Sequence, residues 1–73
     1  MRELQSELIG DRRVQLLVDR DGRYAVVLEV RGPQGWEDIS LLADAGLAFT
    51  TASRRYRQRL AEQQARALGL DRL

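Results

Sequence analysis

Two apolar-rich runs on either side of a short turn signal constrain the fold of this chain more than any other feature. Residues 13–31 read RVQLLVDRDGRYAVVLEVR, and valine, leucine and tyrosine are residue types that fit a pleated, half-buried strand surface. The tripeptide RDG between the runs predicts a three-residue hairpin loop in which Gly22 adopts the left-handed conformation. The chain is therefore expected to contain an antiparallel hairpin at its centre.

The loop length decides which side chains face one another across this hairpin. A two-residue loop would place Val14 opposite Glu29. A three-residue loop makes the facing pairs apolar: Val18 with Tyr24, Leu16 with Val26, and Val14 with Leu28. Because a one-residue slip moves every side chain to the opposite face, the three-residue loop is favoured.

Further turn signals extend the hairpin into a sheet. They are GD at 10–11, GPQG at 32–35 and DAG at 44–46, and they delimit strands expected over residues 3–9, 13–19, 23–31 and 36–42. A three-residue loop from Gly10 would pair Leu8 with Val14, and a four-residue loop at 32–35 would pair Arg31 with Trp36. Residues 1–9 fit the strand period and the helix period equally poorly, so a short helix there stays an alternative. The core face is expected to comprise Leu4, Leu8, Val14, Leu16, Val18, Tyr24, Val26, Leu28, Val30, Ile39 and Leu41.

The last third of the chain has the composition of a helix. Glycine and proline are absent between Gly46 and Gly69, and alanine, arginine, glutamine, glutamate and leucine dominate. Thr50, Thr51 or Ser53 is expected to cap the helix, and Gly69 to end it. A narrow apolar stripe is formed by Ala52, Tyr56, Leu60, Gln63 and Ala67.

These elements predict an α+β fold in a single domain over residues 1–73. A four-stranded antiparallel β-meander, over about 3–43, is followed by one C-terminal α-helix, over about 51–68, packed on one sheet face in the order β-β-β-β-α.

The composition limits the catalytic and metal-binding sites that the chain can form. The chain has no cysteine and no histidine, so disulfides, thiolate metal sites and the commonest general base are excluded. No carboxylate pair, metal set or phosphate loop has the required spacing, and we expect a protein that is not an enzyme, with no metal, cofactor or small-molecule substrate. The N-terminus lacks the apolar centre of a signal peptide and no apolar run approaches a membrane span, which predicts a cytoplasmic protein with no membrane contact.

The positive charge is unevenly distributed. All twelve basic residues are arginine, and residues 50–73 carry six of them against two acids. Four lie within six positions: Arg54, Arg55, Arg57 and Arg59. Three interpretations stay open for this cluster: the solvated face of a helix, a surface for a polyanion, or a contact with an acidic partner.

The second face of the predicted sheet is unusually apolar for a surface in water. Under the registers above it presents Ile9, Leu17, Ala25, Val27, Trp36 and Leu42, with Arg13, Arg23 and Arg31 among them. Such a patch usually marks an interface. Ile9, Leu17, Val27, Trp36 and Leu42 are accordingly the predicted interface residues, whether two copies pack sheet to sheet or edge to edge. Alternatively Trp36 stacks on a base while the arginines meet phosphates.

The predicted order of four strands and a helix, spanning about residues 3–69, resembles the single-stranded-DNA-binding fold of Whirly proteins and of a family of transcriptional coactivators. It is also similar to one repeat of purine-rich-element-binding proteins. The resemblance is one of element order, and it implies a dimer that binds single-stranded nucleic acid.

Two functions are consistent with these features. The first is a homodimeric, weakly sequence-specific, single-stranded nucleic-acid-binding protein. Its predicted contacts are Arg13, Arg23, Arg31 and Trp36 on the sheet, with Arg54, Arg55, Arg57 and Arg59 as a basic rim. The alternative is an oligomerisation or adaptor module that binds a protein partner through the exposed sheet face.

Overall fold

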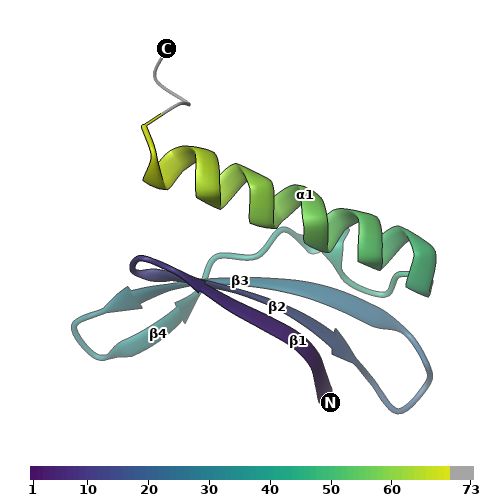
Figure 1. Cartoon of the computed structure of the whole chain (residues 1–73). Helices are drawn as coiled ribbons and strands as arrows, with labels where there is room; N and C mark the ends of the chain where they lie inside the picture. Colours follow the sequence, from purple (N-terminus) through teal and green to yellow (C-terminus); the bar gives the residue numbers. More distant parts are fainter. Residues whose placement is uncertain (70–73) are drawn as a thin grey trace.

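One antiparallel sheet and one helix make two layers in the computed structural model, which describes residues 1–69 (Figure 1). The elements are β1 (Arg2–Ile9), β2 (Arg12–Val18), β3 (Tyr24–Gly32), β4 (Gly35–Asp38), a short 3-10 helix η1 (Leu42–Asp44) and α1 (Phe49–Ala67). The strands are neighbours in the order β1-β2-β3-β4, and α1 lies across β2 and β3. The predicted meander followed by a C-terminal helix is confirmed, and the segment 1–9 is a strand.

The central hairpin has the predicted register. Val18 faces Tyr24, Leu16 faces Val26, and Val14 faces Leu28. Gly22 has a φ of 76°, the left-handed conformation that the three-residue loop requires. The loop is stabilised by the Asp19 carboxylate, which accepts hydrogen bonds from the main-chain N–H groups of Asp21 and Arg23 at 2.8 and 2.9 Å.

The predicted register of the first hairpin is wrong by one residue over residues 5–9, and a β-bulge at Leu4 shifts the register again between Glu3 and Gln5. Only Gly10 and Asp11 form the turn, so Ile9 faces Arg12 and Leu8 faces Arg13 rather than Val14. Gly10 has a φ of 61°, and two-residue turns with positive φ match the twist of a hairpin.

The slip exchanges two apolar side chains between the faces of the sheet. Ile9 packs against the core, whereas Leu8 is 64% exposed on the far side. The predicted apolar pairing failed because the turn contains two residues instead of three, which shifts β1 by one position and turns Ile9 rather than Leu8 toward the helix.

The fourth strand is shorter than the predicted 36–42. Arg31 faces Trp36 as expected, and the Ile39 N–H still donates to the Leu28 carbonyl at 2.8 Å. The Ser40 hydroxyl then accepts the Leu28 N–H at 2.8 Å in place of a main-chain carbonyl. The chain consequently leaves the sheet, and Leu41 is about half exposed instead of pairing with Val26.

The core lies between the helix and the two central strands and is small. Its buried apolar members are Val14, Leu16, Val26, Ala52 and Tyr56, and Ile9, Tyr24, Leu28, Leu47 and Leu60 pack partly buried around them. The predicted helical stripe is largely confirmed, since Ala52, Tyr56 and Gln63 are buried.

The two ends of the helix are determined differently. No side chain caps the start, so the predicted cap by Thr50, Thr51 or Ser53 is wrong. The chain enters the helix through Leu47, whose main chain forms two 2.8 Å hydrogen bonds with Tyr24 of β3. The end is as predicted, with Gly69 at a φ of 76° donating to the Arg66 carbonyl.

The register of the first hairpin gives a prediction for stability. Ile9→Ala should lower the free energy of unfolding by about 1–2 kcal/mol, because it removes a partly buried side chain from the core. Leu8→Ala, the matched control, should change it by less than about 0.5 kcal/mol. Urea denaturation followed by circular dichroism measures both, and the reverse ranking would contradict the register.

Candidate interaction surface

The sheet face turned away from α1, here called the outer face, is not covered by any helix or second sheet of the described residues (Figure 1). Cross-strand pairing places on it Glu3, Ser6, Leu8, Arg13, Gln15, Leu17, Ala25, Val27, Glu29, Arg31, Trp36 and Asp38. The face therefore combines apolar side chains along its centre with charges of both signs.

Trp36 is the centre of a cluster on the outer face. The Arg13 guanidinium carbon lies 4.5 Å from the indole centroid, and the Arg31 guanidinium carbon lies 4.9 Å from it. Arg13 Nε also donates to Glu29 Oε1 at 2.8 Å. Three predicted contact residues thus lie together, but their indole and guanidinium groups already bind one another.

Beside this cluster runs the apolar part of the outer face. Leu17 faces Ala25, and Val27 faces Gln15, in the middle of the sheet. The Gln15 amide donates to the Glu3 carboxylate at 3.0 Å, and this hydrogen bond is the main reason that the pKa of Glu3 lies below its ordinary value.

Formal charge on the outer face is nearly balanced. Glu3, Glu29 and Asp38 oppose Arg13 and Arg31, which leaves a net charge of about −1. The net charge of this face therefore provides no long-range attraction for a polyanion.

Two predicted interface residues lie elsewhere. Ile9 belongs to the helix side of the sheet, as the corrected register requires. Leu42 lies on η1 and is 97% exposed. It borders an open hollow of about 400 Å³ whose lining also includes Ala25 and Val27, so the apolar surface continues from the outer face toward η1.

Two arginines of the α1 cluster form ion pairs within the fold, and the other two are exposed. Arg55 donates to Asp44 Oδ1 at 2.9 Å, and Arg59 Nε donates to Asp44 Oδ2 at 2.7 Å. Arg59 also pairs with Glu62 at 2.7 Å. The Asp44 side chain is only 3% exposed, and the hydrogen bond from Arg59 holds its pKa below the ordinary value, with a smaller contribution from Arg55.

Sequence reasoning missed Asp44. A signal was present, because a single acid in the turn DAG is followed by arginines four positions apart, which would repel each other without an anion between them. Through these ion pairs Asp44 holds the segment between β4 and α1 against the helix. Arg55 and Arg59 therefore stabilise the fold.

The remaining predicted basic residues are spread over distant parts of the molecule. Arg54 and Arg57 are exposed on α1, where Arg57 donates to the Ser53 hydroxyl at 3.3 Å. Arg23 lies beside the β2–β3 turn, at the opposite end of β3 from Arg31. Within residues 1–69, neither these three arginines nor Arg31 forms an ion pair.

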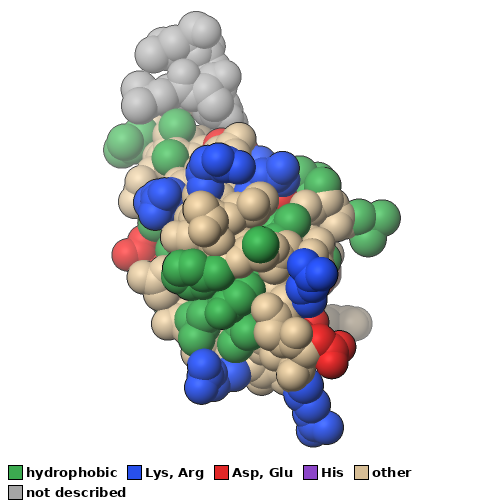
Figure 2. Space-filling model, turned by 90° about the vertical axis from the view of Figure 1, so that its right-hand side faces the viewer, with side chains coloured by type: hydrophobic (Ala, Val, Ile, Leu, Met, Phe, Trp, Pro, Cys, Tyr) green, Lys and Arg blue, Asp and Glu red, His purple; other side chains and the backbone are tan. Residues whose placement is uncertain are grey.

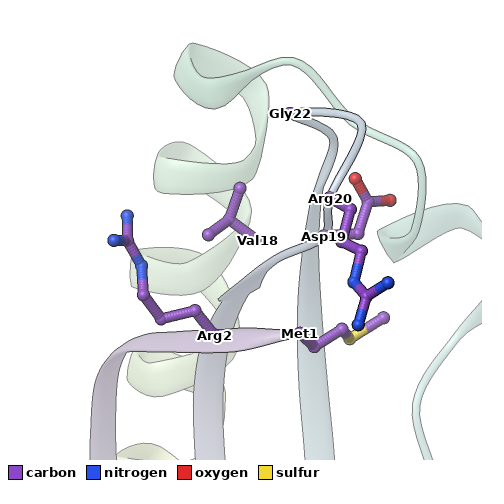
Figure 3. A pocket seen from close by; sticks show the side chains of 6 residues that line it. All are labelled: Met1, Arg2, Val18, Asp19, Arg20 and Gly22. Atoms are coloured by element: carbon purple, nitrogen blue, oxygen red, sulfur yellow. The ribbon is translucent and has the colours of Figure 1, made fainter.

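A second hollow, of about 380 Å³, lies where the start of β1 meets the β2–β3 turn (Figure 3). Its lining includes Arg2 and Arg20, whose guanidinium groups point to opposite sides of the strands (Figure 3). Polar groups do not converge there on one point, so the hollow offers no constellation for a small ligand.

Neither a metal-binding cluster nor a membrane-spanning helix is present among the described residues. Among residues 1–69, histidine, cysteine and carboxylate side chains do not gather in a group of three that could hold a metal ion. The single α-helix of this region is not apolar enough over a sufficient length to cross a membrane.

Comparison with known proteins finds no family model, no curated protein and no solved structure that matches the chain. No matching structure therefore supports the resemblance in element order that the sequence suggested. Function has to be inferred from the surfaces of this chain.

The buried carboxylate gives a prediction for pH and stability. Asp44→Asn should lower the free energy of unfolding at neutral pH by about 2–3 kcal/mol, because two guanidinium groups lose their anion. Since folding lowers the pKa of Asp44, its contribution is complete above its unfolded pKa of about 3.9 and is lost as the pH falls through the lower folded value.

The acid limb of the stability profile should therefore be flatter in Asp44→Asn than in the wild type. Chemical denaturation between pH 2 and 7 measures this difference. Asp11→Asn, in an exposed turn, serves as the control. Parallel profiles for wild type and Asp44→Asn would contradict the role of Asp44.

Proposed function

We propose that this chain is a protein-interaction module whose outer face binds a protein partner. The observation that carries the proposal is the uncovered apolar group of Leu17, Ala25 and Val27 in the middle of the outer face, with Trp36 and Leu8 near the other end of the face and charges of both signs between them. Contiguous apolar surface on a soluble chain usually marks an interface. The partner that fits is a protein surface with an apolar centre and a rim of mixed charge.

The chemistry of the Trp36 cluster supports this assignment. Tryptophan and arginine are enriched among the residues that contribute most to protein interfaces, and they contribute best when held rigid before binding. Arg13 is held by Glu29, and the indole contacts the guanidinium groups of Arg13 and Arg31. Little conformational freedom is left to be lost when a partner binds.

Photo-crosslinking tests the outer face directly. A benzophenone amino acid at Leu17 should form one discrete heavier adduct, identified by mass spectrometry as a single partner protein, when the protein is irradiated in cells. The same group at Gln58, exposed on α1, should not form this adduct, and Val27→Asp should abolish it. Equal adducts from both sites, or an adduct of twice the subunit mass from Leu17, would contradict the proposal.

Single-stranded nucleic acid is a second candidate, supported by a different part of the surface. Figure 2 shows arginine side chains around a hydrophobic patch on the end of the molecule where α1 begins. Phe49, the first residue of α1, is 53% exposed and meets the Tyr24 ring edge-on at 5.1 Å. Aromatic rings surrounded by basic groups are typical of sites for single strands.

Salt dependence distinguishes the two candidates. Fluorescence anisotropy of a labelled 20-nucleotide oligonucleotide should show no binding at micromolar protein in 50 mM salt if the module binds protein alone. Binding that weakens steeply at 200 mM salt, as counterion release requires, would support the second candidate. In that case Phe49→Ala and Arg54→Gln should weaken it, whereas Gln58→Ala should not.

A further inference from the structure

The outer edge of β1 is a second unpartnered surface. β1 is the outermost strand on its side of the sheet, and no described segment lies beside its far edge (Figure 1). Seven of its eight residues are exposed. An exposed edge strand presents unpaired N–H and C=O groups to any strand that can match them.

Two hydrogen bonds of the central hairpin show which main-chain groups of β2 point toward β3 and which point toward β1. The Asp19 N–H donates to the Arg23 carbonyl at 2.8 Å, and the Arg31 N–H donates to the Asp11 carbonyl at 2.7 Å. In an antiparallel pair, hydrogen-bonded pairs alternate with pairs that are not bonded. Odd-numbered residues of β2 therefore bond to β3, and even-numbered residues of β2 turn their main chain toward β1.

The same alternation identifies the groups on the open edge of β1. Glu7 faces Val14 and Ile9 faces Arg12, so Glu7 and Ile9 turn their main chain toward β2. Ser6 lies between these bonded positions, and its N–H and C=O groups point outward, as do those of Leu8.

We propose that β1 pairs antiparallel with β1 of a second copy of this chain, around a two-fold axis at Ser6. In this register Ser6 faces the other Ser6 and Gln5 faces Glu7, while Leu8 lies opposite the bulged residue Leu4. In a single copy Leu4 is 37% exposed and Leu8 is 64% exposed. Two amide–carboxylate pairs would form at once, by symmetry.

Neighbouring registers are less favourable. Moving the axis to Glu7 places two carboxylates opposite each other. Moving it to Gln5 brings Glu3 opposite Glu7 twice and leaves Leu4 opposite a serine. Like charges directly opposite destabilise strand pairs, so of these three axes only the one at Ser6 avoids repulsion.

A second copy is the occupant that the chain's own burial favours. Among residues 1–69, only five apolar side chains are buried, whereas eight large ones are more than a third exposed: Met1, Leu4, Leu8, Ile39, Leu41, Leu42, Phe49 and Leu68. A domain of this size buries a small fraction of its surface, and association of identical copies adds burial. The leucines of β1 are the members of this set that a copy of the same strand can cover.

The resulting assembly would be one continuous sheet of eight strands. A two-fold axis perpendicular to the sheet keeps both helices on one side and both outer faces on the other. Edge pairing does not depend on the proposed function, since it leaves the outer faces uncovered and places two of them side by side.

Ser6→Pro tests the edge. Proline at this position removes an outward N–H without removing a bond to β2, and edge strands tolerate such a proline. Sedimentation equilibrium should show a dimer for wild type and for Ser6→Ala, and a dissociation constant raised at least about tenfold for Ser6→Pro. An unchanged circular dichroism spectrum shows that the variant is folded.

A single cysteine tests the position of the axis. The chain contains no cysteine, so Ser6→Cys should form a disulfide-linked dimer on mild oxidation, because residues facing each other in such a pair are within disulfide reach. Gln34→Cys, in the β3–β4 turn on the far side of the sheet, should not. Amide hydrogen exchange adds a readout, since the Ser6 and Leu8 amides should be protected only in the dimer.

The results of these experiments distinguish the edge pairing of β1 from the proposed protein-binding role of the outer face. A wild type that stays monomeric at millimolar concentration overturns the edge pairing and leaves the outer face as proposed. A dimer that survives Ser6→Pro and gives no crosslink at position 6 also overturns it, by placing the dimer contact elsewhere. Loss of the dimer in Ser6→Pro together with the crosslink at position 6 supports it, whatever the photo-crosslinking at Leu17 shows.

Discussion

The pairing of β2 with β3 is the constraint on which the rest of the structure depends. It aligns Val14 and Leu16 with Leu28 and Val26 on one face, and the helix can bury its narrow stripe only against that row. The same register places Leu17 and Val27 on the opposite face. A core on one side and an uncovered apolar row on the other are thus two results of one alignment.

A second constraint is the scarcity of covering layers. Four strands present two faces and two edges, and one helix covers part of one face. β1 receives almost no cover, which is why its first seven residues are exposed. The candidate surfaces all lie where cover is missing: the outer face, the open edge of β1, and the end of the molecule beside Phe49.

Charge shows how a count along the sequence differs from an arrangement in space. Residues 50–73 carry a net charge of +4, which suggests a basic element. In the fold, Asp44 forms ion pairs with Arg55 and Arg59, and Arg59 also pairs with Glu62. On the other side of the sheet, Arg13 is paired with Glu29. Fewer arginines are therefore available to a polyanion, and they are spread over separate surfaces.

Sequence alone determined the element order, the central register, the helical stripe and the end of α1 at Gly69. These features depend on local alternation and on turn residues, which act over a few positions. Tertiary structure decided the face taken by Leu8 and Ile9, the point where β4 leaves the sheet, the start of α1 and the partners of Arg55 and Arg59. Each of these depends on groups distant in the chain, such as the Leu28 N–H that Ser40 binds and the Asp44 carboxylate, and a periodicity carries no information about which distant group will meet a given residue.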